Sequence, residues 1–101
     1  MKKTHQFSVT LPVQFIKDGK AFVAYCPALD ISTQGDTFED AQKMFNEFVH
    51  IYIDELIEMG TLEEVLMSCG WVKEPKRKQW IPPAIDFIRE NMQQINIPCS
   101  I

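Results

Sequence analysis

Long apolar runs are missing from this sequence of 101 residues. No run approaches the roughly 18 consecutive apolar residues that a membrane-spanning helix needs. The first lysines are followed by polar Thr4-His5-Gln6 rather than by the apolar core of a signal peptide. Together these absences predict a cytoplasmic protein with no membrane anchor. The length predicts one domain over residues 1–101, with a core at 5–70 and a C-terminal extension at 71–101.

Cysteine and histidine are too few and too scattered for a metal site. The three cysteines and two histidines show none of the paired spacings of zinc ligands. An odd number of cysteines also fits poorly with a secreted disulfide framework. We therefore expect buried, reduced thiols and neither a metal nor another cofactor.

Basic residues are scarce in the middle of the chain. The net charge is −4, and nine acidic residues between Asp36 and Glu64 are opposed by Lys43 alone. A chain this acidic binds phosphate backbones poorly, and the short run Lys76-Arg77-Lys78 is only a weak indication of DNA contact. The charge pattern favours a basic protein partner over a nucleic acid.

Three strands are predicted in the first third of the chain. Apolar residues alternate with polar ones from Phe7 to Phe15, which is typical of a strand, and Asp18-Gly19 is a hairpin turn signal. A second strand is expected over Ala21–Cys26 and a third over Ile31–Gln34. Strands joined this closely form an antiparallel meander.

Two helices are predicted next. Thr37 with Asp40 resembles a capping box, apolar residues follow at helical spacing to Met59, and Gly60 is a C-terminal stop. Thr61 with Glu64 repeats the capping signal for a short helix over Leu62–Cys69.

The region after Gly70 is less regular. A helix over Pro83–Met92 is one interpretation, and a final strand over about 94–101 is expected from the alternation of Ile95, Ile97, Cys99 and Ile101 with polar residues. The predicted fold is α+β, in the order β-β-β-α-α-β: a three-stranded antiparallel meander, a long helix, a short helix and a C-terminal strand.

An ordered set of residues resembles the HicB antitoxin family. The set is Phe22-Val-Ala-Tyr-Cys-Pro27, Leu29, and Thr33-Gln-Gly-Asp-Thr37 leading into an acidic helix. The resemblance covers Val13 to about Gly70. It departs from the family where Leu29 runs directly into Asp30, without the Pro-Gly-Cys turn that the family often has.

The resemblance implies an incomplete ribonuclease-H-like fold, in which the final strand joins beside the first. It also implies an antitoxin that binds and neutralises a HicA toxin, a small basic RNA-cleaving protein. The alternative is a free-standing HicB-like adaptor or regulatory domain with no toxin partner. A C-terminal DNA-binding module, which many family members carry, is not expected in the residues after Gly70, so DNA binding is not expected either.

No catalytic residue is predicted. A nuclease of this architecture needs carboxylates on neighbouring strands to hold two metal ions, but the first and last predicted strands carry none. Asp18, Asp30 and Asp36 are expected in turns. Cys26 beside Tyr25 has no histidine or acid placed near it by the sequence to activate it.

Two candidate contact surfaces for a protein partner follow. The first is the outward face of the long helix, with Glu47, Asp54 and Glu58; the second is the turn of Pro27, Ala28, Leu29 and Asp30. The long helix also has apolar residues on both flanks of its core stripe, and these are covered either by the short helix and C-terminal segment or by a partner. The surplus apolar surface predicts a homo-oligomer, a dimer or larger.

Overall fold

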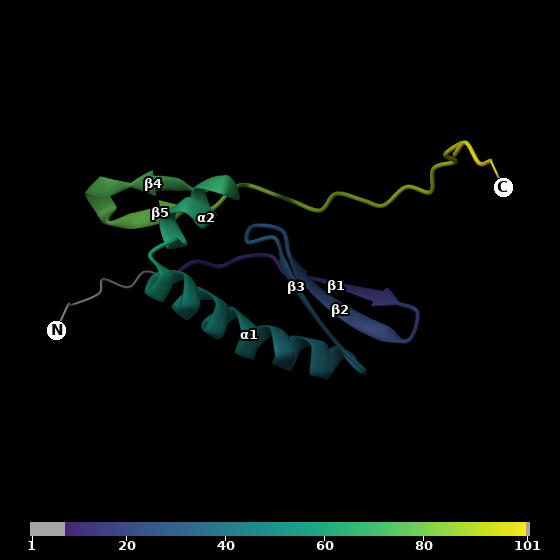
Figure 1. Ribbon diagram of the computed structural model, residues 1–101, viewed down its shortest axis with the longest axis horizontal. Coiled ribbons are helices and arrows are strands. Elements are labelled where there is room, and N and C mark those ends of the chain that lie inside the picture. The colour runs from purple at the N-terminus through teal and green to yellow at the C-terminus, as the bar shows by residue number, and fades with distance from the viewer. Residues whose placement is uncertain (1–7, 101) are drawn as a thin grey trace.

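A three-stranded antiparallel sheet, a long helix across one of its faces, a short helix and a small hairpin make up the fold (Figure 1). The structure is a computed structural model that describes residues 8–100. The α+β class and the meander predicted from the sequence are confirmed. No helix within residues 8–100 is long and apolar enough to cross a membrane.

The meander consists of β1 (Gln14–Asp18), β2 (Ala21–Cys26) and β3 (Ile31–Gly35). Gly19 adopts a positive φ of 62° in the turn between β1 and β2, as the Asp18-Gly19 signal predicted. The first strand begins later than predicted, because its partner strand is short. Gln14 pairs with Tyr25, and β2 ends at the next residue, Cys26. Residues 8–13 therefore have no strand opposite them and belong to no strand. Phe7 lies outside the described residues.

The long helix α1 (Phe38–Met59) has the ends that the sequence predicted. The Thr37 hydroxyl accepts a hydrogen bond from the Asp40 amide at 3.0 Å, and Gly60 ends the helix with a φ of 71°. The short helix α2 (Leu62–Ser68) begins as predicted and stops one residue early. Its expected cap is not formed, since the Thr61 hydroxyl is buried and makes no hydrogen bond within the described chain.

The core lies between α1 and the sheet and continues to α2 and to Trp71, the residue before β4. Ala24 and Cys26 of β2 face Ala41 and Phe45 of α1, and Leu66 and Trp71 close the cluster from the C-terminal side. All three cysteines are free thiols, but only Cys26 is fully buried; Cys69 is half-buried and Cys99 is exposed. The expectation of three buried thiols is therefore wrong for Cys99.

The start of α1 approaches the end of β3 very closely. The Thr33 hydroxyl donates to the Ala41 carbonyl at 3.2 Å. A Cβ atom at Gly35 would lie 2.6 Å from the amide nitrogen of Ala41 and 2.6 Å from Cβ of Asp40. Only glycine allows this contact, so Gly35 sets the distance between the helix and the sheet.

The C-terminal region differs from the prediction. A hairpin of β4 (Val72–Glu74) and β5 (Gln79–Ile81) forms a second sheet, with the 3-10 turn Pro75–Arg77 between them. The helix suggested for Pro83–Met92 and the strand predicted for about 94–101 are both wrong for the described residues, because residues 82–100 form neither. Figure 1 shows this tail running away from β4 and β5, with no strand edge beside it to complete a sheet. Ile101 lies outside the described residues.

Candidate protein-binding site

The outward face of α1 carries an acidic stripe, which we define as Glu47, Asp54 and Glu58. The spacings of seven and four residues place the three side chains on one side of the helix, and all three are exposed. The described residues contain two ion pairs, Lys73–Glu63 at 2.8 Å and Arg77–Glu74 at 3.3 Å, and neither involves α1. The charge of the stripe is therefore not neutralised by neighbouring cations in residues 8–100.

The stripe continues into the last turn of α1, where acidic residues oppose the helix dipole. This turn contains no basic residue, and Glu58 lies beside the partial negative charge of the helix C-terminus. We expect Glu58→Lys to raise the free energy of unfolding by about 0.5–1 kcal/mol at low salt. Urea denaturation followed by circular dichroism measures the change. Glu47→Lys, in the middle of the helix, serves as the control and should change stability by less than about 0.5 kcal/mol. Equal effects of the two variants would contradict the dipole explanation.

The second predicted surface, the turn of Pro27, Ala28, Leu29 and Asp30, is largely buried. Ala28 is 2% and Leu29 5% exposed, so both are core residues. The indole nitrogen of Trp71 donates to the Ala28 carbonyl at 2.7 Å, and the Cys69 thiol lies 3.7 Å from the Leu29 carbonyl. Neither Ala28 nor Leu29 has side-chain surface to offer a partner. At this turn only half-buried Pro27 and exposed Asp30 are accessible.

Asp30 is held in place by Tyr25. The Tyr25 hydroxyl donates to Oδ1 of Asp30 at 2.9 Å, and Asp30 adopts a left-handed conformation with a φ of 53°. The hydrogen bond to Asp30 raises the pKa of Tyr25 above its ordinary value of 10.0, and partial burial and the charge of the carboxylate act in the same direction. The protonated phenol is thus favoured in the folded chain, and the stability that it contributes is present below pH 10 and is lost as the pH rises through the raised pKa.

We expect Asp30→Asn to lower the pKa of Tyr25 towards its ordinary value, because asparagine tolerates the left-handed conformation but carries no charge. The ultraviolet absorbance of the phenolate measures the titration, in a Tyr52→Phe background where Tyr25 is the remaining tyrosine. Asp36→Asn, which removes a carboxylate elsewhere, should leave the titration unchanged. A Tyr25 titration that does not respond to Asp30→Asn would show that this hydrogen bond is not formed in solution.

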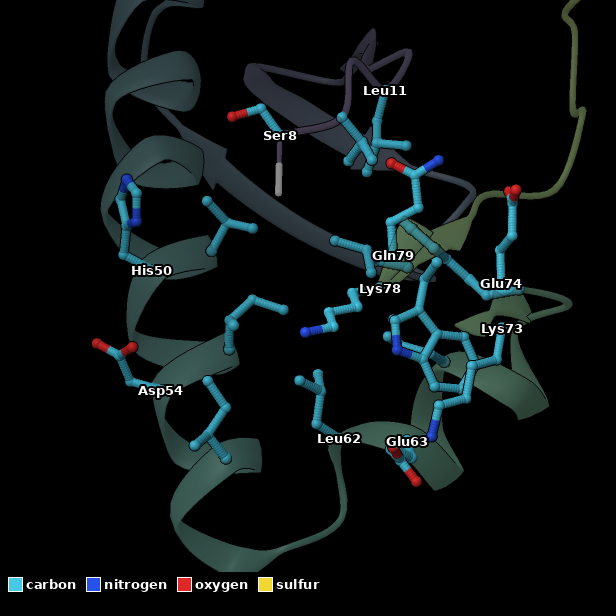
Figure 2. Close-up of a pocket in the computed structure, with 18 of the residues that line it drawn as sticks. Ser8, Leu11, His50, Asp54, Leu62, Glu63, Lys73, Glu74, Lys78 and Gln79 are labelled. Atoms are coloured by element: carbon cyan, nitrogen blue, oxygen red, sulfur yellow. Dashed lines mark hydrogen bonds and ion pairs between the residues drawn. The ribbon is translucent and has the colours of Figure 1, made fainter. Parts of the chain in front are cut away.

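A large apolar groove lies beside the acidic stripe (Figure 2). Its volume is about 960 Å³, and its walls come from α1, α2, the hairpin and the segment before β1. The apolar lining includes Val49, Ile53, Ile57, Leu62, Leu66, Trp71, Trp80 and Leu11. Charged and polar side chains surround it: Figure 2 shows His50 and Asp54 on the helix side, Glu63 below, and Lys78 reaching across.

One wall of the groove is a flank of α1 whose apolar residues exceed what packing on the sheet requires. Val49 and Ile53 are half-buried and Ile57 is 50% exposed, so α2 and the hairpin cover this flank only in part. The opposite flank is open as well, since Met44 and Ile51 are 48% and 57% exposed. The interpretation that the short helix and the C-terminal segment cover both flanks is therefore wrong within the described chain. Sequence reasoning found the excess apolar width of α1 but not the groove, which depends on where the hairpin lies.

The three carboxylates that were predicted in turns do not meet. Asp18 is the last residue of β1 and pairs with Ala21, so the prediction of a turn is wrong for Asp18. Asp36 follows Gly35, which pairs with Phe22 at the same end of the meander. Asp30 precedes β3 at the opposite end. Among residues 8–100 there is no group of three or more His, Cys, Asp or Glu side chains that could hold a metal ion.

Comparisons with models of protein families, with curated proteins and with solved structures found no match to this chain. What it binds must therefore be argued from its own surface. The two features that stand out on that surface are the acidic stripe and the adjoining apolar groove.

Proposed function

We propose that this chain is a HicB-like antitoxin, which binds and neutralises a small basic HicA-type RNA-cleaving toxin by direct protein contact. The proposal assigns a binding role to the chain and no catalytic step. It draws on the residue pattern from Phe22 to Thr37 and on the order of the meander and α1, which is the order that the resemblance implies.

The observation that carries the proposal is the acidic stripe, whose carboxylates form no ion pair within residues 8–100. A toxin that cleaves RNA needs a positive surface to hold phosphates, and an exposed helix face with Glu47, Asp54 and Glu58 is complementary to such a surface. Six carboxylates lie on α1, and Lys43 is the only lysine or arginine of the helix. None of these carboxylates forms an ion pair in the described residues. Complementary charge of this kind steers encounter and sets orientation.

Affinity requires apolar contact in addition to charge, and α1 supplies it next to the stripe. Met44 and Ile51 are about half exposed on the flank that neither α2 nor the hairpin covers. Apolar anchors beside a charged rim are the usual arrangement of a protein interface. The proposed toxin surface therefore includes the stripe and this flank.

The test is the binding kinetics of a small basic protein encoded beside this chain, measured at two salt concentrations. We expect the double variant Glu47→Lys with Asp54→Lys to bind about tenfold more slowly or worse at low salt. The reason is that it reverses the charge that steers the encounter. The association rate of the native chain should fall steeply as salt is added, and that of the double variant should fall less.

A matched control separates the stripe from the overall charge. Asp18→Lys with Glu64→Lys raises the net charge by the same four units, from −4 to zero. These two exposed residues lie on β1 and α2, away from the outward face of α1. We expect a much smaller loss of rate from the control. Equal slowing by both double variants would place the toxin elsewhere. No binding by the native chain would favour the free-standing adaptor or regulatory domain.

A further inference from the structure

The C-terminal tail, residues 82–100, carries large apolar side chains that cover nothing. Phe87, Ile88, Met92, Ile95 and Ile97 are between 69% and 95% exposed. Exposed apolar side chains in such a row normally mark a binding segment. The tail of an isolated chain leaves this surface in water, so a partner for it is expected.

The end of the tail has the pattern of one strand. Ile95, Ile97 and Cys99 alternate with Asn96, Pro98 and Ser100, so that a strand here would be apolar on one side and polar on the other. In a strand, the backbone N–H groups of Ile95, Ile97 and Cys99 would point to one neighbouring strand, and Pro98 would point to the other side. The missing N–H of Pro98 would therefore not interrupt pairing on the first side. Residues 91–100 carry no charge.

The groove offers a matching surface. Its α1 wall presents Val49, Ile53 and Ile57, which span about 12 Å along the helix axis. The stretch from Ile95 to Cys99 spans about 13 Å as a strand. Residues 8–13, which border the groove at Ser8, Val9 and Leu11, belong to no strand and leave backbone groups available for pairing.

The path of the tail decides which copy supplies it. Pro83 packs against Gly70, 3.5 Å from where a Cβ would be, and the pair Pro82-Pro83 stiffens the exit from β5. From there the tail runs away from the hairpin and from the groove, past the meander, to the far end of the view in Figure 1. A second copy carries a net charge of −4 and repels the first, and an uncharged segment is the part that approaches it at the lowest electrostatic cost.

We propose that residues 95–99 of a second copy occupy the groove, with Ile95, Ile97 and Cys99 against α1, in a reciprocal exchange of tails between two chains. Three side chains per tail, each burying about 100 Å² and counted on both surfaces for two tails, give about 1,200 Å², which is the lower bound of a stable interface. The exchange concerns the chain without any toxin, so it stands or falls independently of the antitoxin role.

Sedimentation of the full chain at micromolar concentration tests the exchange. We expect a dimer for the native chain. Ile95→Asp with Ile97→Asp, which puts two charges on the apolar side of the tail, should raise the dimer dissociation constant at least about a hundredfold. Asn96→Asp with Ser100→Asp puts the same charges on the polar side and should change that constant less than about threefold. A native monomer, or equal effects of the two double variants, would overturn the proposal.

A disulfide trap distinguishes exchange from a tail that folds back on its own chain. A chain with Ile53→Cys and Cys99→Ser is mixed with a chain of different mass that keeps Cys99, both with Cys69→Ser, and oxidised glutathione accepts the two electrons of the coupled thiols. We expect a covalent dimer of one heavy and one light chain. A single chain with Ile53→Cys and native Cys99 that instead forms an internal disulfide as a monomer would overturn the proposal.

Discussion

Trp71→Ala is expected to lower the free energy of unfolding by about 3–5 kcal/mol, which is a large share of the stability of a typical domain. The Trp71 side chain is 6% exposed, and its indole nitrogen donates to the Ala28 carbonyl at 2.7 Å. Alanine would leave a cavity beside Leu66 and would also leave that buried carbonyl without a donor. Urea denaturation followed by far-ultraviolet circular dichroism measures the loss.

Two companion variants separate the contributions. Trp71→Phe keeps much of the ring but removes the donor, and we expect it to cost about 1–3 kcal/mol. Met67→Ala, on the exposed side of α2 at 65% exposure, should change stability by less than about 0.5 kcal/mol. A loss of less than about 1 kcal/mol for Trp71→Ala would mean that the hairpin is not docked on the turn of Pro27 to Asp30 in solution.

Gly35→Ala is expected to cost about 2–3 kcal/mol although it adds a single methyl group. The added Cβ would lie 2.6 Å from the Ala41 amide nitrogen, and backbone atoms at the start of α1 cannot move aside as a flexible side chain can. The helix must therefore shift away from β3, which also stretches the 3.2 Å hydrogen bond between Thr33 and Ala41. Thermal and urea denaturation should both record the loss.

Gly19→Ala is the matched control for the glycine substitution. A Cβ at Gly19 meets nothing within 4 Å, and its φ of 62° is the source of strain. We expect a cost of about 1 kcal/mol from that conformation alone. A larger loss at Gly19 than at Gly35 would show that the helix does not approach the sheet as closely as the structure has it.

The elements that could be predicted are those with local signals. β2 and β3 were indicated by apolar strand residues between turn residues, and both ends of α1 by Thr37 and Gly60, whose roles depend only on near neighbours. The acidic stripe was predictable for the same reason, because helical spacing alone places Glu47, Asp54 and Glu58 together.

The elements that were missed depend on residues far apart in the chain. The hairpin strands have three residues each, which is too few for a clear alternation of apolar and polar residues. Lys78 in the turn between them has a φ of 52°, and without a glycine at that position the sequence does not indicate a turn. Ala28 and Leu29 are buried in one cluster with Leu66 and Trp71, and Trp71 lies 43 residues after Ala28. At the C-terminus the alternation of apolar residues was real, but a strand also needs an edge to pair with, and the described chain brings none to Ile95 and Ile97.

The attachment of the hairpin also bears on how the groove opens. β4 and β5 pair with each other, and they are tied to the rest of the chain through Trp71, through half-buried Trp80 on the core and through the exposed Lys73–Glu63 pair. Small units held by so few contacts open locally at a lower free energy than global unfolding, and their amide hydrogens exchange with solvent through that opening. Because one wall of the groove is the hairpin and the opposite wall is α1, each local opening also widens the groove. An occupant that touches both walls would then slow the exchange of β4 and β5 amides more than that of the meander.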